Sequence, residues 1–466
     1  MSKADNLKDF LIDVADAIRL KKGSTELINP QDFSSEIASL SGGLEIVEMT
    51  ETTATIEPNK VYVWGMVESL NITLGASTND SDFFAFRFRC SKPTMTVVTV
   101  NGATWADDTE LDTQGKPVLD LGSWYQCEIK GGTSALYARL AHYIPFADSK
   151  VEAVLLANGV GDGLGVTYKD AAMVTDISTW FKGNADITAF AEFVNFSGII
   201  ALTKSAFDGC SSLAEISLPA SLTRIWDYAF NGCSSLLKVL NFENTKVTDI
   251  GKAAFSYCSS LAEINFPSSL KQIDSYAFQE CSSLLEVNIP ADVSNLKIRD
   301  LAFTNCQSLS VINTISAISH LGRGAFSGIQ LSGVVNFENL TEIGPYALRY
   351  TNVTKVIFPA IITLPAFFNY DGIFSYCPHL VLVDIGENCT YIGDKSFGRG
   401  VGTQGIDITL IVRASTPPTL GGSLTSGNSA NIGSIFVPDA SVEAYKQATN
   451  WSLYADVIKP LSEYTE

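Results

Sequence analysis

The sequence predicts a mainly β protein with some α-helix: an N-terminal helix pair, an antiparallel β-sandwich, a solenoid of parallel strands and a C-terminal capping helix. Three observations carry this prediction. Apolar residues recur at helical spacing in residues 1–43, and they alternate with polar residues in 44–147. From residue 206 onward, one phrase, AF-x-x-C-S-S-L, recurs at a nearly constant interval. A chain of 466 residues has room for these parts as separate domains.

The balance of charge narrows the classes of partner. The chain has 31 Lys and Arg residues against 50 Asp and Glu, a net charge of −19, and no run of basic residues. This balance argues against nucleic acid and against anionic membrane surfaces as partners. No stretch approaches 18 apolar residues, so membrane insertion is not expected. The first 23 residues lack the continuous apolar segment of a secretory signal, so we expect synthesis and assembly in the host cytoplasm.

Residues 1–43 predict two short helices that anchor or oligomerise the chain. The first has its apolar face at Leu7, Phe10, Leu11, Val14 and Ile18, and the second has Phe33, Ile37 and Leu40. So short a segment buries little surface alone, and its apolar faces need a partner. The wording ADAIRLKKGSTELINPQDFSSEI resembles an N-terminal module of bacteriophage tail and fibre proteins. That resemblance implies contacts with other virion proteins or with sister chains.

Residues 44–147 predict the antiparallel β-sandwich. In FFAFRFRC, Phe84, Phe86, Phe88 and Cys90 share one face of a strand, and Arg87 and Arg89 lie on the other. A glycine pair at 131–132 predicts a hairpin. The two arginines can grip an acidic sugar, although a solvated strand face is the favoured interpretation. The phrases PNKVYVWGMVESLNITL and WYQCEIKGG resemble a small β-domain of phage tail proteins.

Residues 148–200 predict a linker and an N-terminal cap for the solenoid. The segment ANGVGDGLGVTYKDAA resembles an EF-hand-like loop, but glycine, valine or lysine stands where calcium needs carboxylates. No metal is therefore expected. Downstream, Val174, Ile177, Trp180 and Phe181 have helical spacing and can cover the first coil of the solenoid.

Residues 201–440 predict the solenoid itself. The phenylalanine of the repeated phrase recurs every 23 or 25 residues, and Leu348, Phe374 and Phe397 continue the register. The six regular positions are Phe207, Phe230, Phe255, Phe278, Phe303 and Phe326. Units this small bury their apolar side only by stacking on neighbours, so we expect about nine rungs of parallel strands at ~4.8 Å spacing.

A cysteine follows the phenylalanine by three residues in most rungs. These cysteines are Cys210, Cys233, Cys258, Cys281, Cys306 and Cys377. A small apolar side chain whose S–H reaches a carbonyl suits a tight buried bend. The odd total of nine cysteines and the parallel side chains argue against disulfides, and one cysteine per rung lacks the spacing of a metal site. We therefore interpret these cysteines as buried structural thiols.

The phrase I-x-x-x-AF-x-x-C-S-S-L-x-x-I-x-L-P-x-S-L resembles the BspA-like leucine-rich repeat family from about residue 200 to 400. The resemblance implies a leucine-rich-repeat solenoid and a role in binding or adhesion. The end of the chain, 441–466, resembles the usual ending of such arrays, with a helix that starts near Pro438 and Asp439. The residues expected to cover the open core are Val442, Tyr445, Trp451, Tyr454 and Val457.

No catalytic motif accompanies the candidate acid–base residues. His142, His320 and His379 lie far apart without a nucleophile beside them, and no phosphate-binding loop or metal-protease motif occurs. We therefore expect no enzyme, no catalytic residue and no cofactor. A carboxylate pair assembled from distant rungs, as in a glycosidase, remains open.

Candidate contact residues lie where the repeat departs from its own wording. The position after the isoleucine of I-x-x-x-AF (a leucine in one rung) is Gly251, Gly322, Gly344 or Gly393 in several rungs and a large side chain in others. The candidates for receptor or ligand contact are Trp226, Tyr228, Tyr276, Arg299, Tyr346, Phe367, Phe368 and Tyr370. Aromatic rings beside polar groups suit glycan or protein contact, whereas ordinary packing between rungs is the favoured alternative.

Together these features predict a bacteriophage virion protein, a tail or fibre component whose repeat domain binds a host-cell receptor. The expected partners are other virion proteins, a host surface glycan or protein, and sister chains in a homotrimer, which only the resemblance to phage fibres implies. The alternatives are a bacterial cell-surface adhesin of the same repeat family and a capsule-degrading tail-spike enzyme. The location predicted is the virion.

Overall fold

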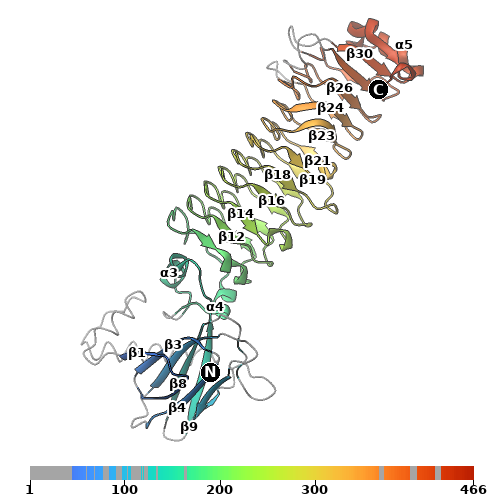
Figure 1. Cartoon of the computed structure of the whole chain (residues 1–466). Helices are drawn as coiled ribbons and strands as arrows, with labels where there is room; N and C mark the ends of the chain where they lie inside the picture. The colour runs from blue at the N-terminus through green and yellow to red at the C-terminus, as the bar shows by residue number, and fades with distance from the viewer. Residues whose placement is uncertain are drawn as a thin grey trace. The chain divides into compact units, whose positions relative to one another are not determined.

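The computed structural model describes residues 45–465 apart from several gaps. The gaps are 59, 68, 77–82, 91–96, 102, 106–116, 118, 120–123, 133–134, 162–164, 367–371, 399–406 and 426–431. The predicted N-terminal helix pair, residues 1–43, lies outside the described residues. The chain divides into two compact units, Met1–Met173 and Val174–Glu466, and strands dominate both (Figure 1). No described helix has the length and apolar character needed to span a bilayer.

The first unit contains two sheets. Its strands are β1 (Glu45–Met49), β2 (Thr53–Ile56), β3 (Lys60–Val67), β4 (Ser69–Leu74), β5 (Phe83–Cys90), β6 (Val97–Asn101), β7 (Thr104–Trp105), β8 (Trp124–Gly132) and β9 (Ala135–Tyr143). Six strands form one sheet in the order β1-β3-β5-β8-β9-β7, and the other sheet has the order β2-β4-β6. The chain therefore passes from one sheet to the other at each step from β1 to β6.

The predicted antiparallel sandwich is wrong in strand direction. Strands β1, β3 and β5 pair in parallel, and so do β2, β4 and β6. Among the described strands of this unit, β8 pairs antiparallel with β5 and with β9, and the predicted hairpin at the glycine pair joins β8 to β9. Alternation of apolar and polar residues indicates which side of a strand is buried but is the same for either direction of pairing.

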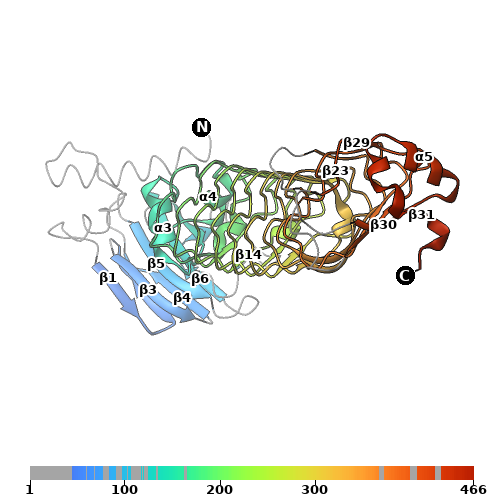
Figure 2. The ribbon, with the colours of Figure 1, turned by 90° about the horizontal axis from the view of Figure 1, so that it is seen from above.

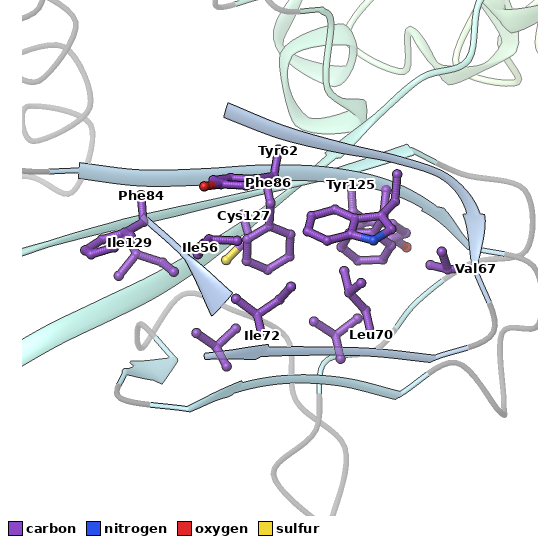
Figure 3. Close-up of a cluster of buried hydrophobic side chains, with 14 of the residues drawn as sticks. Ile56, Tyr62, Val67, Leu70, Ile72, Phe84, Phe86, Tyr125, Cys127 and Ile129 are labelled. Carbon is purple, nitrogen blue, oxygen red and sulfur yellow. The ribbon is translucent and has the colours of Figure 1, made fainter. Parts of the chain in front are cut away.

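A single apolar core lies between the two sheets (Figure 3). Phe84, Phe86 and Phe88 are fully buried, as their alternation predicted, and Trp64 packs edge-on against Phe86 with ring centroids 6.0 Å apart. Leu70 and Ile72 of β4 close the core from the opposite sheet. The side chains of Arg87 and Arg89 lie outside what the structure describes, so the acidic-sugar alternative stays a prediction.

The helix α3 (Ser149–Ala157) ends where the EF-hand-like segment begins, and α4 (Tyr168–Met173) forms the end of that segment. The Asp170 carboxylate accepts hydrogen bonds from the Thr167 backbone N–H at 3.0 Å and from its hydroxyl at 2.7 Å. This carboxylate therefore caps α4. Among the described residues, no group of three or more His, Cys, Asp or Glu side chains converges as a metal site requires.

The second unit is the predicted parallel solenoid, and one long ladder runs through it (Figure 1). The ten strands of this ladder are β11 (Ala201–Leu202), β13 (Arg224–Ile225), β15 (Asp249–Ile250), β17 (Gln272–Ile273), β19 (Leu296–Ile298), β21 (Ile318–Leu321), β23 (Glu342–Ile343), β25 (Thr363–Leu364), β27 (Tyr391–Ile392) and β29 (Thr419–Leu420). The tenth rung was not predicted because Leu424 replaces the phenylalanine there, although the Phe397 N–H still donates to its carbonyl at 3.1 Å.

Three shorter parallel sheets and three 3₁₀ helices complete the coils. The strands are β10 (Ala189–Phe190), β12 (Glu215–Ser217) and β14 (Lys238–Leu240); β16 (Glu263–Asn265), β18 (Glu286–Asn288) and β20 (Val311–Ile312); and β22 (Ser332–Asn336), β24 (Asn352–Phe358), β26 (Leu382–Ile385), β28 (Ile408–Val412), β30 (Ile432–Val437) and β31 (Ile458–Pro460). The 3₁₀ helices are η2 (Ala191–Asn195), η3 (Phe242–Asn244) and η4 (Ile315–Ala317). Each coil thus crosses from the long ladder, through a turn, to one of these sheets.

The repeated phenylalanines stack as one column inside the coils. Rings of successive rungs lie 4.9 to 5.3 Å apart from Phe207 to Phe303, and the two rings of each successive pair are nearly parallel, with interplanar angles of 3° to 13°. Phe181 continues the column, with its ring 5.3 Å from Phe207. The helical spacing of Val174, Ile177 and Phe181 predicted a capping helix; residues 174–181 instead form turns, and all three side chains are buried there.

The cysteines confirm their structural interpretation. Each repeat thiol donates to a carbonyl of the preceding coil, as Cys233 does to Phe207 at 3.1 Å and Cys377 to Leu348 at 3.0 Å. All eight cysteines whose side chains the structure describes are buried and unbridged. Burial raises the pKa of the Cys210 thiol to about 12 and that of Cys377 to about 11, which keeps both protonated at neutral pH.

The C-terminal elements close the open end of the solenoid, as predicted (Figure 2). They are η5 (Asp439–Ser441), α5 (Val442–Gln447), η6 (Trp451–Val457) and η7 (Leu461–Glu463), with β31 added to the last sheet. Tyr445 and Trp451 are fully buried, and their polar atoms donate to the carbonyls of Ala414 and Pro418 at 2.7 Å each. The rings of Tyr445 and Trp451 therefore cover the end of the apolar core, and their polar atoms are hydrogen-bonded.

Candidate functional site: the outer face of the ten-stranded sheet

The long ladder presents a regular outward surface. Each of its strands buries an isoleucine or leucine at one repeated position, which is Ile298 in β19 and Leu321 in β21, and the residues on either side of that position point away from the core. In every rung we group the residue before this buried position with the two residues after it. We call these residues the outer sheet face. Trp226 and Arg299 belong to it, and Tyr228, Tyr276 and Tyr346 stand one residue further on.

Trp226 is the most exposed of the predicted contact residues that the structure describes. Its side chain is 42% exposed, and the guanidinium of Arg224 lies over the indole, 4.1 Å from the ring centroid. Both side chains flank the buried Ile225, so both face outward. A tryptophan held in place by a stacked cation is a rigid contact element, and this arrangement favours the contact interpretation over packing between rungs.

The three tyrosines share one backbone conformation and one kind of partner. Tyr228, Tyr276 and Tyr346 have φ of 59°, 63° and 59°, in the left-handed region that large side chains rarely adopt. A cation from the preceding rung lies over each half-buried ring: Lys204 at 5.9 Å, Lys252 at 5.7 Å and Arg323 at 5.5 Å. The repeat therefore sets aromatic rings and cations side by side at intervals along the solenoid.

Hydrogen bonds between rungs maintain this left-handed backbone. The Tyr228 N–H donates to the Lys252 carbonyl at 2.9 Å, and the Tyr276 N–H donates to the Asp300 carbonyl at 3.0 Å. Other residues at the same place in the repeat, such as Ser205 and Ala253, have the same conformation. The position in the coil thus determines the backbone conformation, and the residue type at that position determines which side chain is presented at the surface.

Sequence reasoning missed a second aromatic group. The rings of Tyr350 and Tyr376 stack with centroids 4.8 Å apart, and the Arg349 guanidinium lies 4.6 Å and 5.3 Å from them. Both tyrosines occupy the place immediately before the cysteine position and have positive φ. The same place holds Gly209 and Gly232 in early rungs, so the change from glycine to tyrosine was the signal available in the sequence.

The glycines that follow the buried isoleucine have a structural cause. A Cβ at Gly322 would lie 2.5 Å from the carbonyl carbon of Arg299 and 2.6 Å from the N atom of Asp300. Gly251 and Gly344 meet the backbone of the preceding rung as closely. These glycines are therefore required by close packing of adjacent coils. They also leave the surface without side chains at those points.

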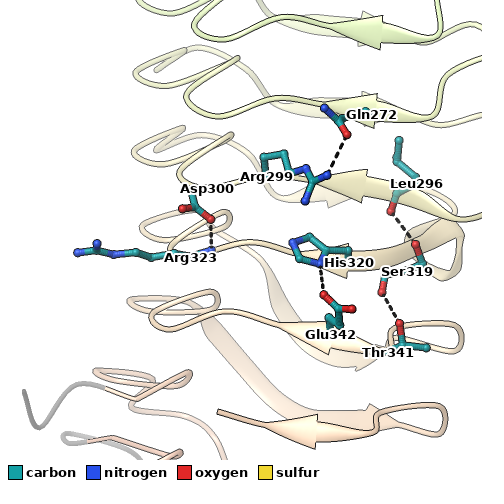
Figure 4. Close-up of polar contacts among 9 residues, drawn as sticks. All are labelled: Gln272, Leu296, Arg299, Asp300, Ser319, His320, Arg323, Thr341 and Glu342. Carbon is teal, nitrogen blue, oxygen red and sulfur yellow. Dashed lines mark hydrogen bonds and ion pairs between the residues drawn. The ribbon is translucent and has the colours of Figure 1, made fainter. Parts of the chain in front are cut away.

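A hollow of about 580 Å³ lies where Gly322 and Gly344 are neighbours. His320 Nδ1 lies 2.8 Å from the Glu342 carboxylate across adjacent rungs, and Asp300 Oδ1 accepts a hydrogen bond from the Arg323 N–H at 2.9 Å (Figure 4). The hollow is lined by Asp300, His320, Gly322, Arg323, Thr341, Glu342, Ile343, Gly344, Pro345, Ile362, Thr363 and Pro365. Hydroxyl, carboxylate and guanidinium groups with two glycines suit a polar ligand more than an apolar one.

The remaining candidates divide between the described and the undescribed residues. Arg299 is half-buried, and its Nη2 donates to Gln272 Oε1 at 3.1 Å beside the hollow (Figure 4). Phe367, Phe368 and Tyr370 lie outside the described residues, so their contact role stays a prediction.

The comparisons with known proteins agree with the repeat. Leucine-rich-repeat solenoids are the class of protein that this fold defines. Within that class, residues 185–306 and 296–410 match the model of the BspA type leucine rich repeat region, in six copies. This part of the chain is therefore similar to BspA-type leucine-rich repeat regions, a repeat typical of non-enzymatic binding or adhesion proteins. No curated protein matches the sequence.

Solved structures of similar sequence include three repeat proteins. A leucine-rich repeat protein from Bacteroides ovatus is 21% identical, with a TM-score of 0.34 over 52% of this chain and 74% of that one. The T. pallidum leucine rich repeat protein is 27% identical, with a TM-score of 0.27 over 39% and 73%. A leucine rich cell surface protein from Faecalibacterium prausnitzii is 17% identical, with a TM-score of 0.27 over 53% and 86%.

Proposed function

We propose that this chain recognises a molecule of the host-cell surface through the outer sheet face, as a component of a bacteriophage tail or fibre. One observation carries the recognition role: Trp226 is exposed on a regular sheet with a guanidinium stacked on it, and tyrosine–cation pairs recur along the same side. Rings with an apolar body and polar neighbours are the residues that interfaces use most.

The rigidity of the solenoid supports the same role. The face is built on strands that hydrogen-bond to both neighbouring rungs, so its side chains need little further ordering when a partner binds. The hollow beside Arg299 adds a concave polar site to this surface. These features suit contact with a glycan or a protein.

The placement in a virion rests on sequence alone. Residues 1–43 and two phrases within 44–147 resemble modules of phage tail proteins, and the proposal assigns them to anchoring on other virion proteins and to homotrimer formation. The BspA-type match favours a second candidate function, a bacterial cell-surface adhesin, because such repeats are typical of binding or adhesion proteins.

Immunogold electron microscopy of purified virions, with antibody raised against the full chain, tests this placement. We expect gold at the tail tip or on projecting fibres. Gold on bacterial cells and none on particles would contradict the virion assignment and support the adhesin. Saturable binding of the fluorescently labelled full chain to intact bacteria tests the recognition role, and the absence of binding would contradict it.

A further inference from the structure

The first six rungs of the outer sheet face reverse the charge balance of the chain, whereas the later rungs add the carboxylates Glu342 and Asp394 and no cation. The whole sequence has 31 basic residues against 50 acidic ones, yet from β11 to the turn after β21 this face has more cations than carboxylates. Its cations, which we call the cationic stripe, are Lys204, Arg224, Lys252, Lys297, Arg299 and Arg323. Its carboxylates are Asp227, Asp249, Asp274 and Asp300.

The carboxylates of this face are engaged within the protein. Asp227 accepts the Lys252 backbone N–H at 2.9 Å, and Asp300 accepts that of Arg323 at the same distance. Asp274 accepts the Ser275 N–H at 2.6 Å, and Asp249 accepts the Thr248 hydroxyl, also at 2.6 Å. Each carboxylate is thus tied to neutral donors of its own or a neighbouring coil.

The cations remain available to an external partner. Among the described residues, no carboxylate forms an ion pair with any member of the cationic stripe. Arg224, Lys204, Lys252 and Arg323 lie over aromatic rings, and Arg299 donates to a neutral amide. All except the half-buried Arg299 are exposed. A cation over a ring keeps its outer side open to a second, anionic contact.

The opposite side of the same coils is acidic. Glu215, Glu263 and Glu286 occupy the same position in strands β12, β16 and β18, where Lys238 of β14 is the exception. Glu263 and Glu286 are direct neighbours in register. The solenoid therefore segregates charge between its sides although no basic run occurs in the sequence.

We propose that the cationic stripe binds an anionic surface glycopolymer, a polysaccharide with carboxylate, sulfate or phosphate groups at regular intervals, lying along the solenoid. The proposal rests on the recognition function above and specifies its ligand. Rungs repeat at ~4.8 Å, so the cations stand at fixed intervals along a rigid scaffold. Many weak charge contacts on one polymer add up to useful affinity.

Two observations favour a glycopolymer over nucleic acid. The Arg224 guanidinium already covers one side of the Trp226 ring, which is the most exposed ring on the outer sheet face and would be the first to stack on a base. The hollow at the end of the stripe offers Glu342, Thr341 and the Asp300 carboxylate, groups that pair with sugar hydroxyls.

Binding of the full chain to four immobilised polymers tests the proposal. The probes are polygalacturonate for carboxylate, dextran sulfate for sulfate, poly(glycerol phosphate) teichoic acid for phosphate, and dextran as the neutral control. We expect saturable, salt-sensitive binding to at least one anionic polymer and none to dextran. Equal binding to dextran, or tighter binding to double-stranded DNA than to every glycopolymer, would overturn the assignment.

Matched variants locate the contact. Arg224→Gln/Lys297→Gln removes two charges from the stripe, and Lys238→Gln/Lys446→Gln removes two from other surfaces of the solenoid unit. We expect roughly tenfold weaker binding for the first variant and unchanged binding for the second. Arg224, Lys297 and Lys238 are exposed and Lys446 is half-buried beside Glu443, and thermal unfolding of both variants checks that they fold. Equal losses of binding in the two variants, or no loss in the Arg224/Lys297 variant, would overturn the proposal that the cationic stripe is the contact.

The same variants separate failure of the ligand assignment from failure of the proposed function. If the stripe variant binds bacteria as strongly as the unmodified chain does, the stripe proposal falls and the recognition function stands. If the unmodified chain binds the anionic polymer but not bacteria, the ligand chemistry is supported and the recognition function is overturned.

Discussion

At the scale of single residues, the turns of this solenoid depend on positions where the side chain must be small or the backbone left-handed. Gly322 illustrates the first case, since the preceding rung approaches within 2.6 Å of where its Cβ would stand. Tyr276 illustrates the second, since its φ of 63° strains any residue with a Cβ and is maintained by a hydrogen bond to the next rung. Large or charged side chains therefore occur on the surface only at positions where neither a small residue nor the backbone conformation excludes them.

The Gly322→Ala substitution tests the close approach. The added methyl group would contact the backbone of Arg299 and Asp300, and backbone cannot move without shifting the whole rung. We expect a loss of about 2 kcal/mol in the free energy of unfolding, measured with urea. Asp274→Ala, at the same position of another rung, is the control and should cost less than about 1 kcal/mol. Equal losses would show that the glycine is not required for packing.

The buried thiols predict how stability depends on pH. Burial raises the pKa of Cys377 from an ordinary 9.0 to about 11, so the unfolded chain loses this proton first as pH rises. The stabilisation is complete below pH 9 and is lost between pH 9 and 11, by about 1.4 kcal/mol per pH unit for this thiol. Urea unfolding at pH 8 and 10.5 should show the decline.

Cys377→Thr isolates the contribution of one thiol to that decline. Thr351 occupies the equivalent position one rung earlier and donates to the Leu348 carbonyl at 2.7 Å, so a hydroxyl suits this place in the coil. We expect the variant to lose less stability between the two pH values than the unmodified chain does. An identical decline in both proteins would contradict a raised thiol pKa.

At the scale of elements, stacking between coils stabilises the solenoid. Phe255 lies between Phe230 and Phe278, with ring centroids 4.9 Å and 5.1 Å away. Phe255→Ala should therefore lower the free energy of unfolding by about 3 to 5 kcal/mol. Because each rung contacts only its neighbours, hydrogen exchange should speed up most in the two adjoining rungs.

Phe255→Leu is the matched control for this column. Leu348 occupies the same position in another rung, and a leucine keeps most of the buried volume. We expect a loss of about 1.5 kcal/mol or less. A loss as large as that of the alanine variant would mean that ring stacking, and not filled volume, stabilises the column.

Prediction from sequence succeeded where one residue type repeats. The intervals between Phe207, Phe230 and Phe255 predicted the parallel ladder and the buried column, and Tyr445 and Trp451 predicted the cap. Strand direction in residues 45–101 was wrong because alternation does not encode pairing. Residues 174–181 bury Val174, Ile177 and Phe181 at the first coil, as predicted, but they are not helical as their spacing suggested. Phe181 joins the phenylalanine column, and an irregular chain buries these side chains as well as a helix would.

The candidate site was predicted only in part, for a related reason. Trp226 and Tyr276 were found as departures from the repeat, but their partners Arg224 and Lys252 come from positions that vary freely in sequence. The pairing of Lys252 with Tyr276 depends on the register of adjacent rungs. The hollow exists because Gly322 and Gly344 have no side chains to fill it. Only the stacking of their two rungs shows that these glycines are neighbours.

At the scale of the whole molecule, the solenoid unit combines a rigid array with two unlike surfaces. The outer sheet face carries rings and cations, and the opposite strands carry glutamates and exposed aliphatic residues such as Leu237 and Leu285, which are 52% and 55% exposed. We propose that recognition uses the outer sheet face. Both surfaces offer exposed apolar side chains, so a comparison between them is a fair test.

The most direct measurement is the binding of labelled full-length chain to bacteria for two double variants, Trp226→Ala/Tyr346→Ala on the outer sheet face and Leu237→Ala/Leu285→Ala on the opposite side. We expect at least roughly tenfold weaker binding for the Trp226/Tyr346 variant and unchanged binding for the Leu237/Leu285 variant. A loss confined to the second variant, with both proteins folded, would contradict it.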